Sequence, residues 1–510
     1  MTASRSPVVP VPAAVNPHAP ALDDLTRQRT WEELADRCAR AARLLRHGLG
    51  LAPDDHAAIV MDNRAEFVEL VLGAILAGVW ITPINRHLGP EEIAYVIRDS
   101  GAKALFCDPA HEDLARRSPA PVVLAAGAEL DAALAASSAE PMPLDGPAGA
   151  PMIYTSGTTG RPKGVKRARP ASLGAALDGM GVAGRRLGLD GRGPHLVTGP
   201  LYHAAPLLFA LYDQRNGAPM VVMPSWDDAR VLPLLAEREI RHTHMVPTMF
   251  VRLLRLPAAV RERFDPGALR LVLHGAAPIA PDVKRSMIEW WGPVLVEYWG
   301  ATEGGVCTLV DSADWRAHPG TVGRATPAFE VFAVDAAGAR LPAGATGVLY
   351  CRHTSGTDVF EYHGAPEKTA ACHLAPGVFT TGDVGRVDAD GWVYLSDRQA
   401  NTIISGGVNI YPAEIEQVLQ QHPAVADVGV FGIPDDEWGE TVKAAVELMD
   451  GRRPSPELAA DILAFGRQRL AGYKIPRTLD FVDRLPRDPT GKLRIRLLRD
   501  PYWRDRGRSI

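Results

Sequence analysis

Residues 154–165 (YTSGTTGRPKGV) contain small, hydroxyl-bearing and cationic side chains close together, a combination that favours anion binding. Glycines let the backbone approach a ligand closely, and successive N–H groups and hydroxyls can then form a concave anion site. A lysine adds positive charge, and the apolar residues 150–154 predict a strand that leads into this loop. The candidate phosphate ligands are Thr155, Ser156, Gly157, Thr158, Thr159, Gly160 and Lys163.

This loop does not match the P-loop pattern G-x-x-x-x-G-K-[ST]. Counted from Gly157, the sixth position is Pro162, and Gly164 follows Lys163. The simplest structural alternative is a glycine-rich turn with solvated charges. The length of the string favours phosphate binding over that alternative.

A second string, residues 297–303 (EYWGATE), offers the other groups that a nucleotide needs. An aromatic face can stack on a base, a hydroxyl can bind phosphate, and a carboxylate suits Mg²⁺, which prefers oxygen ligands. Single candidates occur elsewhere: His203 in PLYHAAP, Asp383 in TGD, Arg398 in SDR and Lys492 in PRDPTGKL. Standing alone, each of these residue types is usually structural or solvated, so their weight depends on the pattern as a whole.

These strings resemble, in the same order along the chain, the motifs of the adenylate-forming (ANL) superfamily, and within it the acyl-CoA synthetases that act on fatty or bulky acids. The resemblance implies ATP, Mg²⁺ and coenzyme A as ligands, with Mg²⁺ on Glu303 and Thr158. It implies catalytic roles for Lys492, Thr302, Glu303 and His203. Beyond the phosphate loop, the implied nucleotide ligands are Gly275, Ala276, Ala277, Pro278, Tyr298, Trp299, Gly300, Thr302, Asp383, Arg398 and Lys492.

The same resemblance assigns the acyl and coenzyme A sites. The implied acyl pocket contains His203, Ala276, Gly304 and Gly305, and the implied coenzyme A site contains Gly406, Gly407 and Lys474. Three positions depart from the usual pattern: His274 replaces the first glycine of the adenine loop, Trp299 replaces a tyrosine, and Ala400 occupies the hinge position. Alanine permits a change in φ and ψ, so we still expect a hinge there.

The implied reaction has two halves. A carboxylate first reacts with ATP to give acyl-adenylate and pyrophosphate; the C-terminal domain then rotates, and coenzyme A displaces AMP. Small residues at 276–277 and 304–305 leave volume, so we expect a long-chain or bulky polycyclic acid rather than acetate. Two alternatives stay open: an enzyme that loads the phosphopantetheine arm of a carrier protein, and a nucleotide-binding module without catalysis.

The elements that must position these motifs alternate between strand and helix. Strands are expected at 56–61, 79–84 and 104–107 and helices at 31–45, 65–77 and 90–98, the first behind a capping box of Thr30 and Glu33. Such alternation predicts a layered α/β fold with mainly parallel strands, which binds ligands at the carboxyl ends of its strands. Short strands from about residue 320 predict a small β-rich subdomain.

We therefore expect four parts: a flexible arm (1–22), a large N-terminal adenylation domain (23–397), a hinge (398–401) and a smaller, mobile α+β C-terminal domain (402–510). The net charge of -5 gives no reason to expect nucleic-acid binding. Five scattered cysteines without C-x-x-C spacing indicate a reducing, cytoplasmic compartment. No signal peptide or membrane span is expected, and the resemblance leaves a homodimer open.

Overall fold

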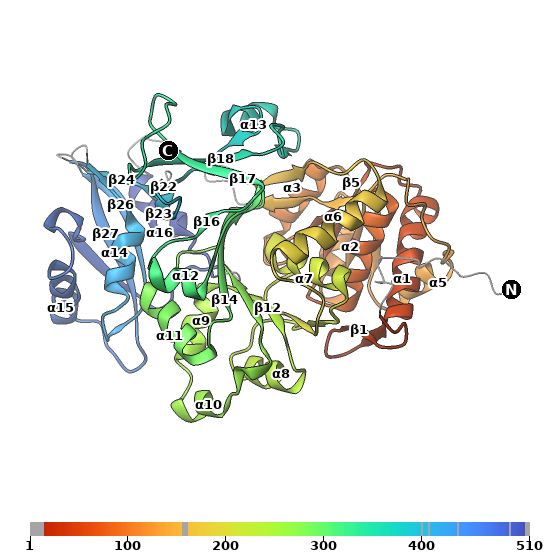
Figure 1. Ribbon diagram of the computed structural model, residues 1–510, viewed down its shortest axis with the longest axis horizontal. Helices are drawn as coiled ribbons and strands as arrows, with labels where there is room; N and C mark the ends of the chain where they lie inside the picture. The colour runs from red at the N-terminus through yellow and green to blue at the C-terminus, as the bar shows by residue number, and fades with distance from the viewer. Residues whose placement is uncertain are drawn as a thin grey trace.

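The computed structural model describes residues 15–155, 162–398, 401–405, 408–435, 438–488 and 491–504. Its early elements (α1, α2, α5) lie at one end and its late elements (α14, α15, β26, β27) at the other, with a large sheet between them (Figure 1). This confirms the predicted mixed α/β architecture, with a large N-terminal part followed by a smaller C-terminal one.

Nine strands form the largest sheet of the described residues, in the order β16-β15-β14-β13-β12-β10-β11-β1-β2. Strands β10 to β14 and β1 run parallel where they pair, and β15, β16 and β2 run antiparallel to their neighbours. The bounds are β1 Pro20–Asp23, β2 Gln28–Thr30, β10 His195–Val197, β11 Met220–Val222, β12 His242–Met245, β13 Leu271–His274, β14 Leu295–Ala301, β15 Gly305–Asp311 and β16 Arg324–Ala325.

A five-stranded parallel sheet, β6-β5-β3-β4-β7, supports the N-terminal end. A three-stranded sheet, β19-β9-β8, lies beside the cavity described below. The bounds are β3 His56–Val60, β4 Trp80–Pro83, β5 Ala102–Cys107, β6 Val122–Ala125, β7 Ala150–Pro151, β8 Ile153–Thr155, β9 Lys163–Arg167 and β19 Phe360–Tyr362.

The two remaining sheets are mainly antiparallel. One contains β17 Phe329–Val334, β18 Gly347–His353, β20 His373–Ala375, β21 Val378–Phe379, β22 Asp383–Val387 and β23 Val393–Arg398, and confirms the β-rich segment predicted after residue 320. The other contains β24 Ile403–Ser405, β25 Val408–Ile410, β26 Val425–Asp435, β27 Gly439–Leu448 and β28 Thr478–Val482.

Helices cover these sheets and begin where the sequence signals predict. Both hydrogen bonds of the Thr30–Glu33 capping box are present at the start of α1, and α2 ends at Gly78 in the left-handed region (φ 74°). The helices are α1 Trp31–Arg43, α2 Ala65–Ala77, α3 Pro90–Ser100, α4 Glu112–Arg116, α5 Ala128–Ala135, α6 Leu173–Arg186, α7 Ala204–Asn216, α8 Val231–Glu237, α9 Pro247–Leu254, α10 Ala258–Arg263, α11 Pro281–Trp291, α12 Ser312–Ala317, α13 Pro366–Cys372, α14 Pro412–Leu419, α15 Pro456–Arg467 and α16 Ile495–Trp503.

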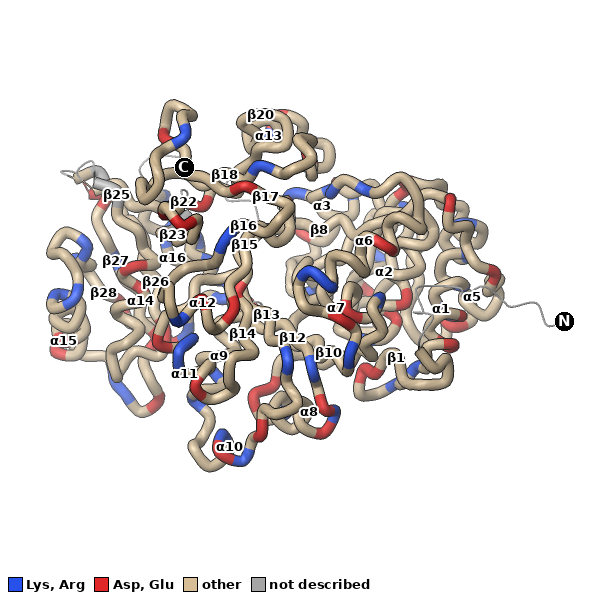
Figure 2. Tube along the Cα trace, viewed as in Figure 1, with Lys and Arg blue, Asp and Glu red and all other residues tan. Residues whose placement is uncertain are grey.

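The largest apolar core lies around α2, every residue of which is buried. Its two glutamates are held by arginines: Glu66 by Arg27 and Arg64, and Glu69 by Arg29 and Arg37. On the rest of the chain, Lys and Arg are interspersed with Asp and Glu (Figure 2). None of the described helices is both long and apolar enough to cross a membrane.

Candidate active site

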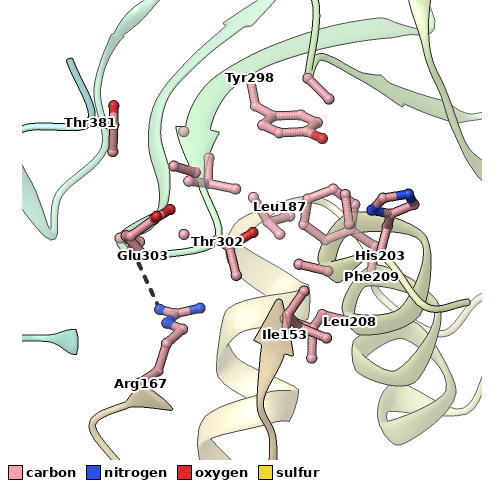
Figure 3. A pocket seen from close by; sticks show the side chains of 18 of the residues that line it. Ile153, Arg167, Leu187, His203, Leu208, Phe209, Tyr298, Thr302, Glu303 and Thr381 are labelled. Atoms are coloured by element: carbon pink, nitrogen blue, oxygen red, sulfur yellow. Dashed lines mark hydrogen bonds between the residues drawn. The ribbon is translucent and has the colours of Figure 1, made fainter. Parts of the chain in front are cut away.

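A cavity of about 680 Å³ opens where β8 and β9, the β14–β15 turn and the ends of α6 and α7 meet. Figure 3 shows side chains from these elements converging on one space. Of the predicted site residues, the following line it: Thr155, Lys163, His203, Ala276, Tyr298, Gly300, Thr302, Glu303, Gly304, Gly305 and Lys492.

The phosphate-loop side is framed by β8 and β9. Thr155 and Lys163 are directly paired across these strands, so both ends of the predicted loop are fixed at the cavity. The Lys163 ammonium lies 4.5 Å from the centre of the Tyr362 ring. The predicted ligands between them, Ser156, Gly157, Thr158, Thr159 and Gly160, lie outside the described residues.

Glu303, predicted to hold Mg²⁺, is 8% exposed and accepts a hydrogen bond from the Tyr362 hydroxyl at 2.9 Å. Burial, and then the Glu303 charge, raise the pKa of Tyr362 well above its usual value, so the phenol keeps its proton and donates it. Tyr362 could not be predicted from the sequence, because its motif, FEYHG, offers no chemical signal of its own. The tyrosine fixes the carboxylate from β19, a strand almost 60 residues away.

The metal prediction can be tested against the donors present. Within the described ranges, no three His, Cys, Asp or Glu side chains gather into a metal site. The Glu303 carboxylate in the cavity wall is a suitable donor for Mg²⁺, which is usually bound through one or two carboxylates together with substrate phosphates.

The predicted ribose ligand, Asp383, is buried at the start of β22. It accepts hydrogen bonds from the Trp299 indole (3.1 Å) and the Thr381 hydroxyl (2.7 Å). Trp299 is 7% exposed and packs in an apolar cluster rather than lining the cavity. Arg398 pairs with Asp383 through the backbone of β23, and its side chain lies outside the description.

Tyr298 points the opposite way from Trp299, into the cavity, as alternation along a strand requires (Figure 3). Its hydroxyl and the Nε2 of His244 are 3.0 Å apart, and its ring meets Phe209 edge-on at 5.2 Å. Burial lowers the pKa of His244 to about 3, so this imidazole is neutral. No sequence signal identified His244, which is one of two histidines in the buried strand β12.

The adenine-loop motif only partly reaches the cavity: Ala276 lines it, while Gly275, Ala277 and Pro278 do not. A β-carbon on Gly275 would lie 2.5 Å from the Tyr298 carbonyl oxygen, so glycine is needed for this close packing. His274, the departure from the family pattern, is fully buried against Phe250.

The side of the cavity predicted to hold the acyl group is formed largely by α6, its C-cap residue and α7, which contribute Ala183, Leu187, Ala204, Ala205, Leu208, Phe209 and Tyr212. His203 precedes α7 as its N-cap residue. Burial lowers the pKa of His203 to about 4; the Asp488 charge opposes this shift and the Lys492 charge adds to it. Its Nε2 is buried and has no hydrogen-bond partner in the described part of the chain.

The expectation that Gly304 and Gly305 leave empty volume requires correction. A β-carbon on Gly304 would lie 2.4 Å from the Phe379 ring, and one on Gly305 would lie 3.0 Å from the Arg167 guanidinium. The room that these two glycines leave is occupied by the side chains of Phe379 and Arg167. Arg167, which was not among the predicted site residues, lines the cavity (Figure 3).

The C-terminal part reaches the same cavity. Lys492 and Asp488 line it, and a β-carbon on Gly491 would lie 2.2 Å from the Thr248 hydroxyl oxygen. Lys474, a candidate for coenzyme A, is instead bonded to Glu414 at 2.6 and 2.7 Å. The hinge residue Ala400 and the loop glycines Gly406 and Gly407 lie outside the described residues.

Comparisons with known proteins agree with this geometry. The AMP-binding enzyme family matches residues 10–359, and the AMP-binding enzyme C-terminal domain matches residues 414–492. The chain is 34% identical to the fatty acid–[acyl-carrier-protein] ligase ScoC of Streptomyces coeruleorubidus, over 97% of this chain and 95% of that one. It is also 34% identical to a feruloyl-CoA synthase of Amycolatopsis, over 94% and 95% respectively.

Among solved structures, ATP-bound MatB from Rhodopseudomonas palustris superposes with a TM-score of 0.84 at 29% identity, covering 96% of each chain. The apo form of MatB superposes with a TM-score of 0.72 at 30% identity, covering 95% of this chain and 96% of the other. The described arrangement is therefore more similar to the ATP-bound form of that protein.

Proposed function

The chain belongs to the AMP-binding enzyme family, and from that premise we propose that it is an acid–thiol ligase that activates a carboxylic acid with ATP and transfers the acyl group to coenzyme A. The observation that carries this proposal is the cavity itself. It brings Thr155 and Lys163, Glu303 and the C-terminal Lys492 to one space with an apolar chamber behind them.

In the first half-reaction, one carboxylate oxygen attacks the α-phosphorus of ATP, and the bond to the β-phosphate oxygen breaks to release pyrophosphate. Catalysis of such a transfer depends on positioning and on neutralising charge. Lys163 attracts the phosphates, and Lys492 attracts the carboxylate and the α-phosphate. His203, neutral at physiological pH because burial lowers its pKa to about 4, borders the reacting carboxylate without adding charge.

Glu303 would hold Mg²⁺ together with the phosphates, and Tyr362 orients this carboxylate. When bound, the cation supplies neutralisation of the negative charge that develops on the leaving phosphates. Thr158 is the second proposed ligand. Thr302, beside Glu303 in the cavity wall, donates its hydroxyl to the α-phosphate.

In the second half-reaction, the thiolate of coenzyme A attacks the carbonyl carbon of the acyl-adenylate and AMP leaves. We propose that the segment around residues 398–401 acts as the hinge, withdrawing Lys492 and presenting Gly406 and Gly407. Lys474 would have to leave Glu414 before it could bind a coenzyme A phosphate. The five cysteines are free thiols, which suits a reducing compartment such as the cytoplasm.

The chamber behind the reaction centre suits an acid larger than acetate, because α6 and α7 line it with apolar side chains. Names of relatives support both small-molecule and carrier acceptors: feruloyl-CoA synthase in one case and an acyl-carrier-protein ligase in the other. Coenzyme A is the acceptor we favour, and a carrier-protein arm is the second candidate.

The test is release of pyrophosphate and AMP from ATP and Mg²⁺ across a panel of carboxylic acids, each with and without coenzyme A. We expect acid-dependent release, with a thioester formed only when coenzyme A is present. Pyrophosphate release without any thioester would favour the carrier acceptor. Release that needs no acid, or none with any acid, would contradict the ligase function.

A further inference from the structure

The guanidinium of Arg167 lies in the cavity wall with most of its hydrogen-bonding capacity unused. It stands at the end of β9 and is partly buried. Among the described residues it makes one long hydrogen bond, from Nη2 to the Gly304 carbonyl at 3.4 Å, and no ion pair with a carboxylate. A guanidinium carries five N–H donors, so several are left for a ligand.

The position of Arg167 depends on the glycine beside it. Gly305 has a φ of 79°, and a β-carbon there would lie 3.0 Å from Nη2 and 3.1 Å from Nη1. The guanidinium is therefore packed against bare backbone. A side chain at position 305 would both strain the turn and push the guanidinium away.

Arg167 is not placed to share the phosphates with Lys163. The two residues are at opposite ends of the five-residue strand β9. A strand advances by about 3.3 Å per residue, which separates their Cα atoms by roughly 13 Å. The phosphate loop precedes Lys163, so it joins β9 at the end opposite to Arg167.

A second donor borders the same region. His353 also lines the cavity, and its Nδ1 accepts the Ser355 amide hydrogen at 3.2 Å, which leaves the proton of the neutral ring on Nε2. Burial, and then the Arg167 charge, lower the pKa of His353. The nearby wall is apolar, with the Phe329 ring 5.1 Å from the imidazole.

The described cavity lining contains more positively charged than negatively charged side chains. Two carboxylates, Glu303 and Asp488, face the cations Lys163, Arg167, Arg186, Arg324 and Lys492 in the described lining. Glu303 is held by Tyr362 on the phosphate side. The proposed ligands of Lys163 and Lys492 are the nucleotide and the reacting carboxylate. Neither of these is a proposed ligand of Arg167.

We propose that Arg167, assisted by His353, binds a second acidic group of the substrate acid, so that this enzyme activates dicarboxylic acids in preference to monocarboxylic ones. The proposal rests on the proposed ligase function and specifies its substrate class. A carboxylate can accept two parallel N–H bonds from one guanidinium, the strongest pairing open to an arginine. It would also compensate a partly buried cation that has no carboxylate partner among the described residues.

The experiment compares each dicarboxylic acid with its own monomethyl ester, which keeps the bulk and removes one charge. Aliphatic acids of increasing length and aromatic diacids form the panel, and kcat/KM is measured by pyrophosphate release. A hydrogen bond to a charged group contributes about 1.5–3 kcal/mol, or roughly 10- to 100-fold. We expect the best diacid to exceed its ester by that factor.

Arg167→Met should remove this preference by slowing the diacid reaction while leaving the ester reaction unchanged. Gly305→Ala should also lower the ratio of kcat/KM for the diacid to kcat/KM for its monomethyl ester. Arg192→Met is the control for loss of one positive charge, because Arg192 is almost fully exposed and lies outside the cavity wall. It should keep the wild-type ratio, and thermal melting should show that all three variants fold.

Four results would overturn the proposal. The wild type could prefer every ester to its diacid, or Arg167→Met could leave the ratio unchanged. Alternatively, Arg167→Met could raise only the KM for coenzyme A in thioester formation from supplied acyl-adenylate, which would assign the arginine to coenzyme A. Activity restricted to monocarboxylic acids would overturn this inference while supporting the ligase, whereas no acid-dependent activity would contradict the ligase itself.

Discussion

Charged side chains packed against the large sheet have close partners, whereas some polar groups around the cavity do not among the described residues. Lys284 and Glu297 are 0% and 5% exposed, and their Nζ and Oε2 atoms are 2.6 Å apart. Asp213, also fully buried, is bonded to two histidines, His195 and His242. Around the cavity, by contrast, Arg167 and the Nε2 of His203 have no such partners in the described part of the chain.

This difference separates structural from functional charge. A buried charge without a partner costs several kcal/mol, which is consistent with the pairing of Lys284 with Glu297 and of Asp213 with two histidines. Donors left open beside a cavity carry that cost until a ligand arrives. Satisfied pairs should therefore affect stability when broken, and open groups should affect catalysis.

The largest expected effect is on stability, from Lys284→Met. It leaves the buried Glu297 without its cation, and breaking such a pair costs about 3–5 kcal/mol. The free energy of unfolding should fall by that amount in chemical denaturation. The double variant Lys284→Met/Glu297→Gln should recover much of the loss; if it unfolds as easily as the single variant, the pair is not what holds this region.

Lys492→Ala should show the opposite profile. The side chain is exposed in the cavity mouth, so the melting temperature should change little. Loss of one charge-stabilising donor typically lowers the rate about 10²- to 10³-fold, and we expect that loss in acyl-adenylate formation. Thioester formation from supplied acyl-adenylate should be nearly unaffected.

The control for that variant is Lys368→Ala, an exposed lysine of α13 outside the cavity. It should leave both half-reactions unchanged. Equal slowing of the two half-reactions by Lys492→Ala would place this lysine outside the adenylation step.

The Asp213 cluster predicts a pH dependence of stability. Burial would raise the pKa of Asp213, but the hydrogen bonds from His195 and His242 outweigh it and lower the pKa to about 2. Since the folded pKa lies below the usual value of 3.8, the stabilisation is complete above pH 5 and is lost as the pH falls toward 2. A pKa difference of this size corresponds to about 2 kcal/mol in the free energy of unfolding.

The measurement compares urea unfolding of the wild type with that of Asp213→Asn between pH 5 and pH 3. The advantage of the wild type should shrink steadily with falling pH. A constant difference across this range would show that Asp213 contributes through shape and neutral hydrogen bonds alone.

The smallest effect is expected from Tyr362→Phe, which removes the hydroxyl that orients Glu303 and keeps the ring beside Lys163. A hydrogen bond to a carboxylate contributes about 1.5–3 kcal/mol; because the bound cation also holds Glu303, we expect the lower end, and the Mg²⁺ concentration for half-maximal activity should rise roughly 10-fold. Activity should return at high Mg²⁺. Tyr350→Phe, which alters a tyrosine outside the cavity wall, is the control, and a defect that Mg²⁺ cannot restore would contradict this role.

The sequence predicted what depends on local pattern and on motifs. The helix at 65–77 was predicted with its observed bounds because it is mainly apolar and ends before a glycine. The motif residues Thr155, Lys163, Glu303 and Lys492 do meet at one cavity. Their roles stay predictions until the variants are measured.

What the sequence did not show depends on pairing between distant strands. Arg167 looked like one of several basic residues after the phosphate loop, and its place in the cavity follows from β9 pairing with β19, nearly 200 residues later. Tyr362 reaches Glu303 from the same strand. The glycines at 304 and 305 were predicted to leave space, because only the fold shows which side chains fill it.

The alternation of Tyr298 and Trp299 along β14 has a practical consequence for redesign. Tyr298 faces the chamber and Trp299 bonds Asp383, so each of these two places can be altered by a substitution at a single position. Shortening Tyr298 to valine or alanine should enlarge the chamber and widen the range of acids accepted, at the cost of the contact with His244. A library built at position 298 can therefore explore new acids while the side chain bonded to Asp383 is left unchanged.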